Sequence, residues 1–431
     1  MNEEKVLTPM SRTRILSAML VAMLVAACTA ATPPASLPES SAAASSAATA
    51  GPLKIGVLVP FTESALDSDI GASQRRAADL YLKLQGGKLG GRDVQLVYND
   101  ESLLDAATND VRIQQFLDQD HVEILLGGAS TAGAYQLRNA ADARKVIYID
   151  TNASGNALTR TTNGCTPSCK SHYVFRSTST SWQLSEPLGE WVSKNGQKDF
   201  YLAVVDDAFG NESAAAFIEG LAKNGGKATG RVAVPSRGGG WASVVAGIKA
   251  QPTKSVFAAF VTDDAERFVE AWEAAGLRDA GYRLYGPGPL ADAQVLKATK
   301  QAGLGITTSF QWSTDVDNLE NKTFNDEFRT AYKDEDTGQP LAPDDYAAEM
   351  WDAMRVLDTA LSATKGDTKN TEALIAALEG VSGKTPAGAF TFDRATHNAV
   401  EDVYIREVKA ANGALGNAVV DKIANVKDPG Q

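Results

Sequence analysis

Short apolar runs rich in β-branched residues alternate along the chain with longer segments of helical periodicity. A first series holds four candidate strands and three helical patterns between them: strands 54–60, 94–99, 123–127 and 145–150, and helices 71–84, 105–118 and 131–143. Strand, helix and strand in this order predict a parallel sheet that helices cover on both faces.

A second series repeats the order, with strands 200–205, 230–234, 255–261 and 283–285 and helices 210–223, 241–250 and 264–276. Each series opens with a strand, a polar loop, a glycine (Gly71 or Gly210) and a long helix, although the residues differ. The sequence thus predicts an α/β fold of two doubly wound, Rossmann-like lobes. Ligands of open α/β sheets bind beyond the carboxyl ends of the strands, so we expect a site in a cleft between the lobes.

The last third of the chain is less regular. It holds candidate strands at 306–311, 389–393 and 403–409 and helical patterns at 321–332, 344–362 and 371–378.

The composition argues against several classes of function. The chain has 431 residues, enough for two or three compact units, and a formal net charge of −12, which is poorly suited to nucleic acid. Three Cys and three widely spaced His do not form a Cys/His zinc cluster, so we expect no metal and no cofactor. We find no G-x-S-x-G or G-x-x-x-x-G-K-[ST] motif, and we expect a binding protein rather than an enzyme.

The N-terminus has the pattern of an export signal. Arg12 and Arg14 precede an apolar stretch, 15–27, that is too short to span a bilayer core of about 30 Å. The segment that ends at Cys28 (LVAAC) resembles a bacterial lipobox, which implies cleavage before Cys28 and acylation of that residue. We therefore predict a lipoprotein signal peptide at 1–27, with translation starting at Met1 or Met10.

Residues 28–51 consist almost entirely of Ala, Ser, Thr and Pro and should form a flexible tether, because such a segment buries too little apolar surface to fold. No later apolar run approaches 18 residues, so the mature chain is not expected to cross a membrane. We expect it to be exported and held at the outer face of a bacterial membrane, in the periplasm or at the cell surface, through acylated Cys28.

Motifs spread over Pro52 to Lys422 resemble one protein family. They include KIGVLVPFT at 54–62, the segment around Gly71, LGGAST at 126–131, TNAS at 151–154, VFR at 174–176, DDAFG at 206–210 and YGP at 285–287. In order and spacing they are similar to the periplasmic-binding family typified by the Leu/Ile/Val-binding proteins of ABC importers.

The resemblance implies the type I periplasmic-binding fold, in which the chain crosses three times between the lobes. Mapped onto this sequence, it implies lobe one at 52–177 plus 311–388 and lobe two at 178–310 plus 389–431. The crossings form a three-stranded hinge, and ligand binding closes the lobes in a form that a membrane permease reads. We expect a monomer.

Two loops of lobe one are candidates for binding the ligand. Ser130 and Thr131 open a helix after a buried strand, where free N–H groups and the helix dipole favour a carboxylate, and in family members this serine contacts it. The alternative is that they only cap the helix. Ala153 and Ser154 match the family's second contact segment, although they are also typical of an ordinary turn.

The candidates of lobe two include a departure from the family. Phe209 stands where members often carry a Tyr over the ligand, and it could instead act as a hydrophobic staple. Amino-acid binders commonly carry an acidic residue where Gly288 stands, and its carboxylate neutralises the ligand's ammonium. An unpaired buried ammonium is costly, so either Asp263 or Asp264 replaces that carboxylate or the ligand has no α-amino group.

Cys165 and Cys169 flank Thr-Pro-Ser in a polar loop, and outside the cytoplasm such a close pair is expected to form a disulfide. Its small ring should shape the loop rather than add much stability.

Together these features predict an extracytoplasmic solute-binding lipoprotein that delivers a small carboxylate-bearing solute to an ABC import permease. The solute is either an amino acid, branched-chain or other, or an aromatic or aliphatic acid. The alternative is a ligand-sensing module of the same fold that acts on a membrane signalling partner.

Overall fold

The computed structural model describes residues 51–160, 170–335, 337–411 and 414–430. Cys28, the signal peptide, Cys165 and Cys169 lie outside these ranges, so the predicted acylation and disulfide stay predictions. Within the described ranges, no helix has both the length and the apolar character that a membrane span requires.

The first sheet and the helices packed on it form lobe one. Its six strands lie in the order β2-β3-β1-β4-β5-β6, and every neighbouring pair except β2–β3 is parallel. The strands are β1 (Leu53–Val59), β2 (Lys88–Leu89), β3 (Arg92–Asp100), β4 (Ile124–Gly127), β5 (Ile147–Asp150) and β6 (Val174–Arg176). Every residue of β4 and β5 is buried, as expected of a sheet covered on both faces.

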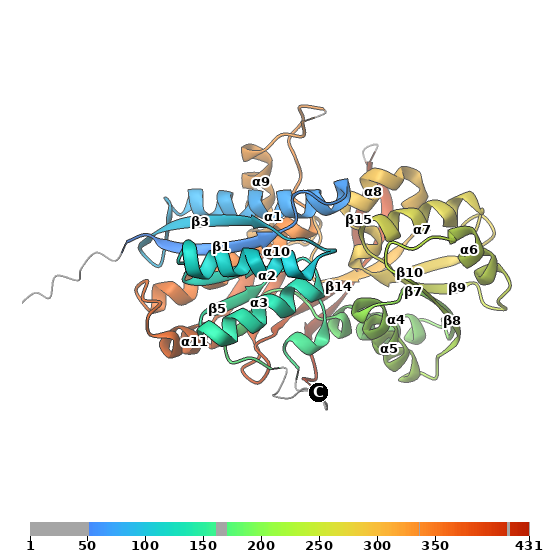
Figure 1. Ribbon diagram of the computed structural model, residues 1–431. Coiled ribbons are helices and arrows are strands. Elements are labelled where there is room, and N and C mark those ends of the chain that lie inside the picture. The colour runs from blue at the N-terminus through green and yellow to red at the C-terminus, as the bar shows by residue number, and fades with distance from the viewer. Residues whose placement is uncertain (1–50, 161–169, 336, 412–413, 431) are drawn as a thin grey trace, which may run out of the picture. The chain divides into compact units, whose positions relative to one another are not determined.

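Helices cover both faces of this sheet (Figure 1). On one face lie α1 (Ala65–Leu84), α9 (Leu319–Ala331), α10 (Asp345–Ala363) and α11 (Thr371–Glu379). On the other face lie α2 (Ala106–Gln114), a π-helical turn (Gln115–Gln119) and α3 (Thr131–Arg144). Alternate strand residues face the two cores: Leu126 and Ile149 pack on the α1 side, and Leu125 and Tyr148 on the α3 side.

The second sheet is the frame of lobe two. Its strands follow the path β12-β13-β14-β11-β10-β9-β7-β8, and β15 pairs with β14. The parallel strands are β7 (Asp199–Val205), β8 (Lys227–Val234), β9 (Ser255–Ala259), β10 (Arg283–Pro287) and β11 (Thr307–Phe310). The antiparallel strands are β12 (Ser382–Thr385), β13 (Gly388–Phe392), β14 (Ala399–Ala411) and β15 (Ala414–Val426).

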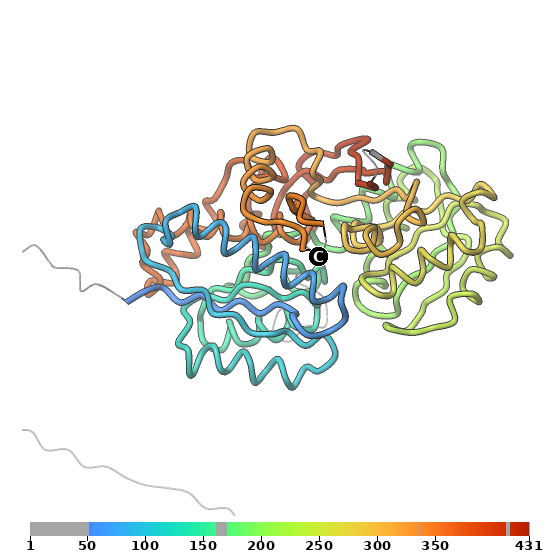
Figure 2. Tube along the Cα trace, turned by 90° about the horizontal axis from the view of Figure 1, so that it is seen from above, coloured from blue at the N-terminus to red at the C-terminus, as the bar shows by residue number. Residues whose placement is uncertain are grey.

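The helices of lobe two are α4 (Ser181–Lys194), α5 (Ala208–Ala222), α6 (Trp241–Lys249), α7 (Thr262–Ala274) and α8 (Ala293–Thr299). Figure 2 shows the blue α1 segment and the orange segments after residue 310 side by side, apart from the green and yellow segments of lobe two. Packing and strand pairing divide the chain differently at β13. This strand pairs with β14, yet Phe390 and Phe392 pack in the core of lobe one.

The chain passes between the lobes after β6 (177–180), after β11 (311–314) and between α11 and β14 (380–398). Glu349 of α10 joins the first two crossings, because its Oε1 accepts hydrogen bonds from Thr178 Oγ1 at 2.5 Å and Gln311 Nε2 at 2.6 Å. Glu401 of β14 accepts from Ser179 Oγ at 3.0 Å. Burial raises the pKa of both carboxyl groups well above the ordinary value.

Helix α4 was not predicted from the sequence. Pro187 lies inside it and lacks the N–H that an interior helical residue donates, so the sequence suggests that a helix ends at this point. The helix is held at its start by a capping box, in which Thr180 and Gln183 each accept a backbone N–H of the other. The sequence patterns also missed α8 and β15.

Two glycines bring helices unusually close to the strands before them. A Cβ on Gly71 of α1 would lie 1.7 Å from the Pro60 carbonyl oxygen, and one on Gly210 of α5 would lie 2.0 Å from the Val205 carbonyl oxygen. Gly71 was expected to begin its helix, but α1 already begins at Ala65, so Gly71 lies in its second turn, while Gly210 lies in the first turn of α5. Each lobe therefore requires a residue without a side chain at this point.

Substituting these glycines tests the close approach. Gly71→Ala and Gly210→Ala should each lower the free energy of unfolding by about 2–3 kcal/mol, because the backbone must move to admit a methyl group. Gly247→Ala in α6 is the matched control: a Cβ there meets nothing within 4 Å, and the change should stabilise the protein by about 1 kcal/mol. Urea unfolding measures all three, and equal effects at the three positions would contradict the packing.

Candidate functional site

The carboxyl ends of the parallel strands carry the candidate loops of both lobes. In lobe one the loop after β4 leads to Ser130 and Thr131, and the loop after β5 holds Ala153 and Ser154. The two loops touch, since Ala153 N donates to Gly128 O at 3.0 Å. A Cβ on Gly155 would lie 2.4 Å from Thr131 Cγ2. The structure thus brings the four predicted residues of lobe one together.

A glutamate that the sequence analysis missed occupies the start of α3. Both oxygens of Glu101 accept hydrogen bonds there: Oε2 from Ala129 N at 2.6 Å, and Oε1 from Ser130 N at 3.0 Å and Ser130 Oγ at 2.7 Å. The Ser130 hydroxyl also accepts from Gly133 N at 2.9 Å. Ser130 is therefore engaged both as the helix cap and as a partner of Glu101.

Thr131 is the residue of this helix start that remains for a ligand. Its side chain is half-buried and faces Gly155 in the neighbouring loop. Within the described ranges, its N–H donates to no protein acceptor, as is usual in the first turn of a helix. The hydroxyl and this N–H together can bind one oxygen-bearing group.

Buried charges hold the loop after β5 in place. Arg176 is fully buried, and its Nη1 and Nη2 donate to Ala153 O at 2.5 Å and Gly155 O at 2.6 Å. Asp150 Oδ1 accepts from Ala153 N at 3.0 Å, and its carboxylate lies 3.6 Å from Arg176. The Ser154 carbonyl accepts from Ser181 N at 2.6 Å, which connects this loop to α4. The backbone of the loop is thus fixed from three sides.

The predicted residues of lobe two lie at the ends of β7, β9 and β10. Phe209 is 8% exposed and packs in the core of lobe two. Asp263 is half-buried, while Asp264 is buried and accepts from Arg237 N at 2.7 Å. In this arrangement Asp264 fixes the backbone of the loop after β8.

Further contacts join the lobes around these loops. Arg237 of lobe two pairs with the buried Asp67 of α1, with 2.8 Å between Nη2 and Oδ2. Asn156 N of lobe one donates to Glu212 Oε2 of α5 at 2.7 Å. One contact lies on the α1 side of the first sheet and the other on the α3 side.

The surroundings of Gly288 contain a positive charge. A Cβ on this buried glycine would lie 2.3 Å from Phe310 Cδ2 and 3.0 Å from Arg406 Nη2. An acidic side chain therefore does not fit without displacing the Phe310 ring. The charged group next to Gly288 is the guanidinium of Arg406, which is paired with Asp345, so Gly288 itself offers no carboxylate to the ammonium of an amino acid.

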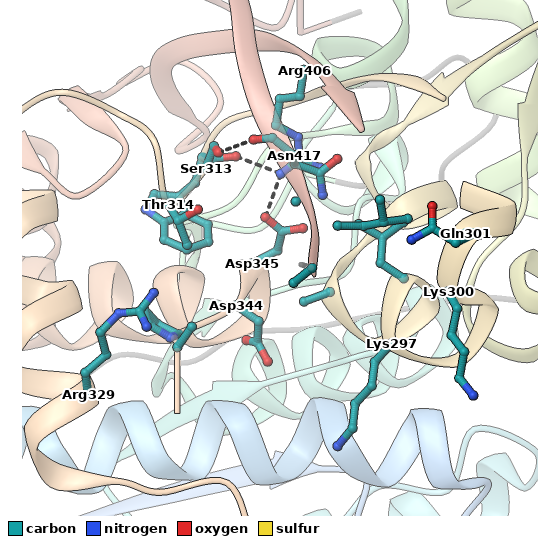
Figure 3. Close-up of a pocket in the computed structure, with 18 residues that line it drawn as sticks. Lys297, Lys300, Gln301, Ser313, Thr314, Arg329, Asp344, Asp345, Arg406 and Asn417 are labelled. Atoms are coloured by element: carbon teal, nitrogen blue, oxygen red, sulfur yellow. Dashed lines mark hydrogen bonds and ion pairs between the residues drawn. The ribbon is translucent and has the colours of Figure 1, made fainter. Parts of the chain in front are cut away.

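A cavity of about 690 Å³ lies near the second crossing, between α8, the β14–β15 hairpin and the start of α10 (Figure 3). We call it the hinge cavity. Its lining includes Lys297, Lys300, Arg329, Arg406 and Asn417. A smaller cavity of about 340 Å³ adjoins it between α1 and α8. Neither cavity is lined by any of the seven ligand residues predicted from the sequence.

No metal centre is evident in the described part of the chain, where no three His, Cys, Asp or Glu side chains are grouped to hold an ion.

The buried Glu101 makes stability depend on pH. Burial raises the pKa of Glu101 to about 7, although the hydrogen bonds from Ala129 and Ser130 act to lower it. The carboxyl group therefore binds its proton more tightly in the folded protein than in the unfolded chain. Its stabilising contribution is full below the unfolded pKa and is lost as the pH rises through about 7.

Glu101→Gln should therefore reduce the fall in unfolding free energy between about pH 5 and pH 7 by about 2 kcal/mol. Urea unfolding at several pH values measures the slope. Asp279→Asn, at a side chain that is 88% exposed, is the control and should leave the slope unchanged. An equal slope in wild type and Glu101→Gln would show that this proton does not contribute.

The chain matches the family model described as "Periplasmic binding protein" over residues 52–414. Leu/Ile/Val-binding protein homolog 6 of Brucella suis is 27% identical over 384 residues, which cover 88% of this chain and 94% of the relative. The resemblance drawn from the motifs is confirmed.

Solved structures agree with the fold. A solute-binding protein of an ABC transporter from R. palustris, in complex with benzoate, is 28% identical and has a TM-score of 0.78, covering 88% of this chain and 99% of its own. Another from Rhodopseudomonas palustris, in complex with 3,4-dihydroxy benzoic acid, is 26% identical with the same TM-score and coverage. The predicted two-lobed type I fold is confirmed. The chain therefore belongs to the periplasmic binding protein family and captures a small solute outside the cytoplasm for import by an ABC transporter.

Proposed function

We propose that the solute is an aromatic or aliphatic carboxylic acid without an α-amino group. The observation that carries this proposal is the pair of groups beside Gly288. Phe310 and the Arg406 guanidinium stand where an amino-acid binder needs a carboxylate for the ligand's ammonium. Of the two alternatives for this position, the ligand without an amino group needs no carboxylate at Gly288.

The loops of lobe one support a carboxylate as the other end of the ligand. Thr131 offers a hydroxyl and an N–H at the start of α3, and the rigid Ala153–Ser154 loop lies beside it. Phe209 in the core of lobe two and Phe310 in the core of lobe one make the surroundings of these strand ends apolar. The two R. palustris proteins, solved with benzoate and 3,4-dihydroxy benzoic acid, add weight to an aromatic acid.

We further propose the finer features that the sequence predicts. The protein is a monomeric lipoprotein, anchored through acylated Cys28 after removal of the signal peptide, and Cys165 pairs with Cys169. Lobe one comprises 52–177 plus 311–388, and lobe two comprises 178–310 plus 389–431. A tether at 28–51 lets the anchored lobes reach the membrane permease.

A thermal-shift panel tests the ligand class. Benzoate and 4-hydroxybenzoate should each raise the melting temperature, because binding to the folded state at 100 times Kd stabilises it by about 2.7 kcal/mol. Leucine, isoleucine and valine, which carry the ammonium, should leave it unchanged. A shift with these amino acids and none with the aromatic acids would overturn the proposal.

The Asp67–Arg237 contact should stabilise the closed form that holds the ligand. Arg237→Ala should weaken the binding of the best ligand of the panel about fivefold, which corresponds to about 1 kcal/mol for a partly exposed pair. Isothermal titration measures Kd. Lys322→Ala removes an exposed ion pair with Asp317 inside lobe one and serves as control. Unchanged affinity in Arg237→Ala would mean that this contact does not favour closure.

A further inference from the structure

The hinge cavity contains two buried polar atoms that lack partners. Arg406 is fully buried; its Nη1 donates to Asp345 Oδ1 at 2.7 Å and Trp312 O at 2.8 Å, whereas Nη2 donates to no atom of the described residues. Asn417 Nδ2 donates to Ala291 O at 2.7 Å, while its Oδ1 accepts from no described residue. Buried polar atoms are nearly always hydrogen-bonded, so this donor and this acceptor are open to a further partner.

The charge of the lining favours an anion. Four cations border the cavity, Lys297, Lys300, Arg329 and Arg406, against the two carboxylates of Asp344 and Asp345. Both carboxylates are engaged: Asp345 with Arg406, and Asp344 with Ala347 N at 2.8 Å and Gln294 Nε2 at 2.6 Å. Lys297 in turn lies 3.7 Å from Asp334, so the excess of positive charge comes from Lys300 and Arg329.

The apolar part of the lining comes from both lobes, and Gln301, Ser313 and Thr314 add polar groups. Leu296 and Leu415 belong to lobe two, Pro343 precedes α10 of lobe one, and Trp312 lies in the crossing between them. Figure 3 shows the Arg406 guanidinium directed toward Asp345 and Asn417, and the lysines of the α8 end on the opposite side. The volume of about 690 Å³ is in the range of small-molecule sites.

We propose that the hinge cavity is a second ligand site, which takes a small organic anion carrying a carboxylate and a hydroxyl group. The carboxylate accepts from Arg406 Nη2 and lies near Lys300, and the hydroxyl donates to Asn417 Oδ1. An anion in this position contacts both lobes. The site shares Arg406 with the proposed function, which places this guanidinium beside Gly288, but its lining includes none of the seven residues of the strand-end site.

A substitution at the rim can fill the cavity without removing any of its polar groups. Ala293 is exposed, lines both cavities and is the first residue of α8, directly after the helix cap Asp292. Ala293→Phe should therefore block the hinge cavity. Ala106→Phe is the matched control, since Ala106 is exposed and follows the helix cap Asp105 of α2.

Equilibrium dialysis of the folded protein with radiolabelled 4-hydroxybenzoate counts the bound equivalents. We expect two for wild type and Ala106→Phe and one for Ala293→Phe. If the strand-end site does not bind this acid, wild type binds one and Ala293→Phe none, which supports the hinge site and contradicts the proposed function. Equal numbers in wild type and Ala293→Phe, including none in both, overturn the hinge site.

A second variant tests the polar contacts. Asn417→Leu removes the unpartnered acceptor and should raise the Kd of the hinge cavity, the site that Ala293→Phe blocks, about tenfold. The Kd of the other bound equivalent should not change. An unchanged Kd for both equivalents would overturn the assignment of Asn417.

Discussion

The two lobes are joined through a buried carboxyl group, that of Glu349. Glu349 accepts hydrogen bonds from Thr178 and Gln311 on two crossings, and its second oxygen accepts from Asn152 Nδ2 at 3.0 Å. Asn152 directly precedes Ala153 in the loop after β5. One side chain of α10 therefore connects two crossings with a candidate ligand loop.

The protonation state of Glu349 affects how it holds the crossings. Burial raises the pKa of Glu349 well above the ordinary value, which favours the neutral acid. A neutral carboxyl group avoids the large desolvation cost of an isolated buried carboxylate. Glu401 has the same character beside Ser179. Both carboxyl groups thus hold the crossings through hydrogen bonds from uncharged side chains.

Periodicity in the sequence predicted the regular elements well, because buried strands and amphipathic helices leave a local pattern. Strand β4 and helix α3 lie within one residue of the ranges expected for them. Helix α4 was missed because Pro187 hides a continuous helix. Strand β15 was missed because its pairing with β14 contains irregular registers, which disturb the alternation that marks a strand.

The site could be predicted only where its chemistry is local. Ser130 and Thr131 were identified because a helix start follows a strand end directly. Glu101 was not, because it reaches that helix start from another strand, 28 residues earlier in the chain than Ala129. Arg406 likewise approaches Gly288 from a distant strand. Such contacts arise from the order of strands in the sheets, which no local pattern contains.

Gly71 and Gly210 have a consequence for how the two lobes are compared. Both meet the same steric demand of a carbonyl oxygen at the end of a strand, yet the residues around them are unrelated. An internal alignment scored on residue identity would thus overlook the correspondence between the halves. A search for backbone positions that tolerate no side chain would detect this correspondence. The same search would also work for other chains whose two halves no longer share residues.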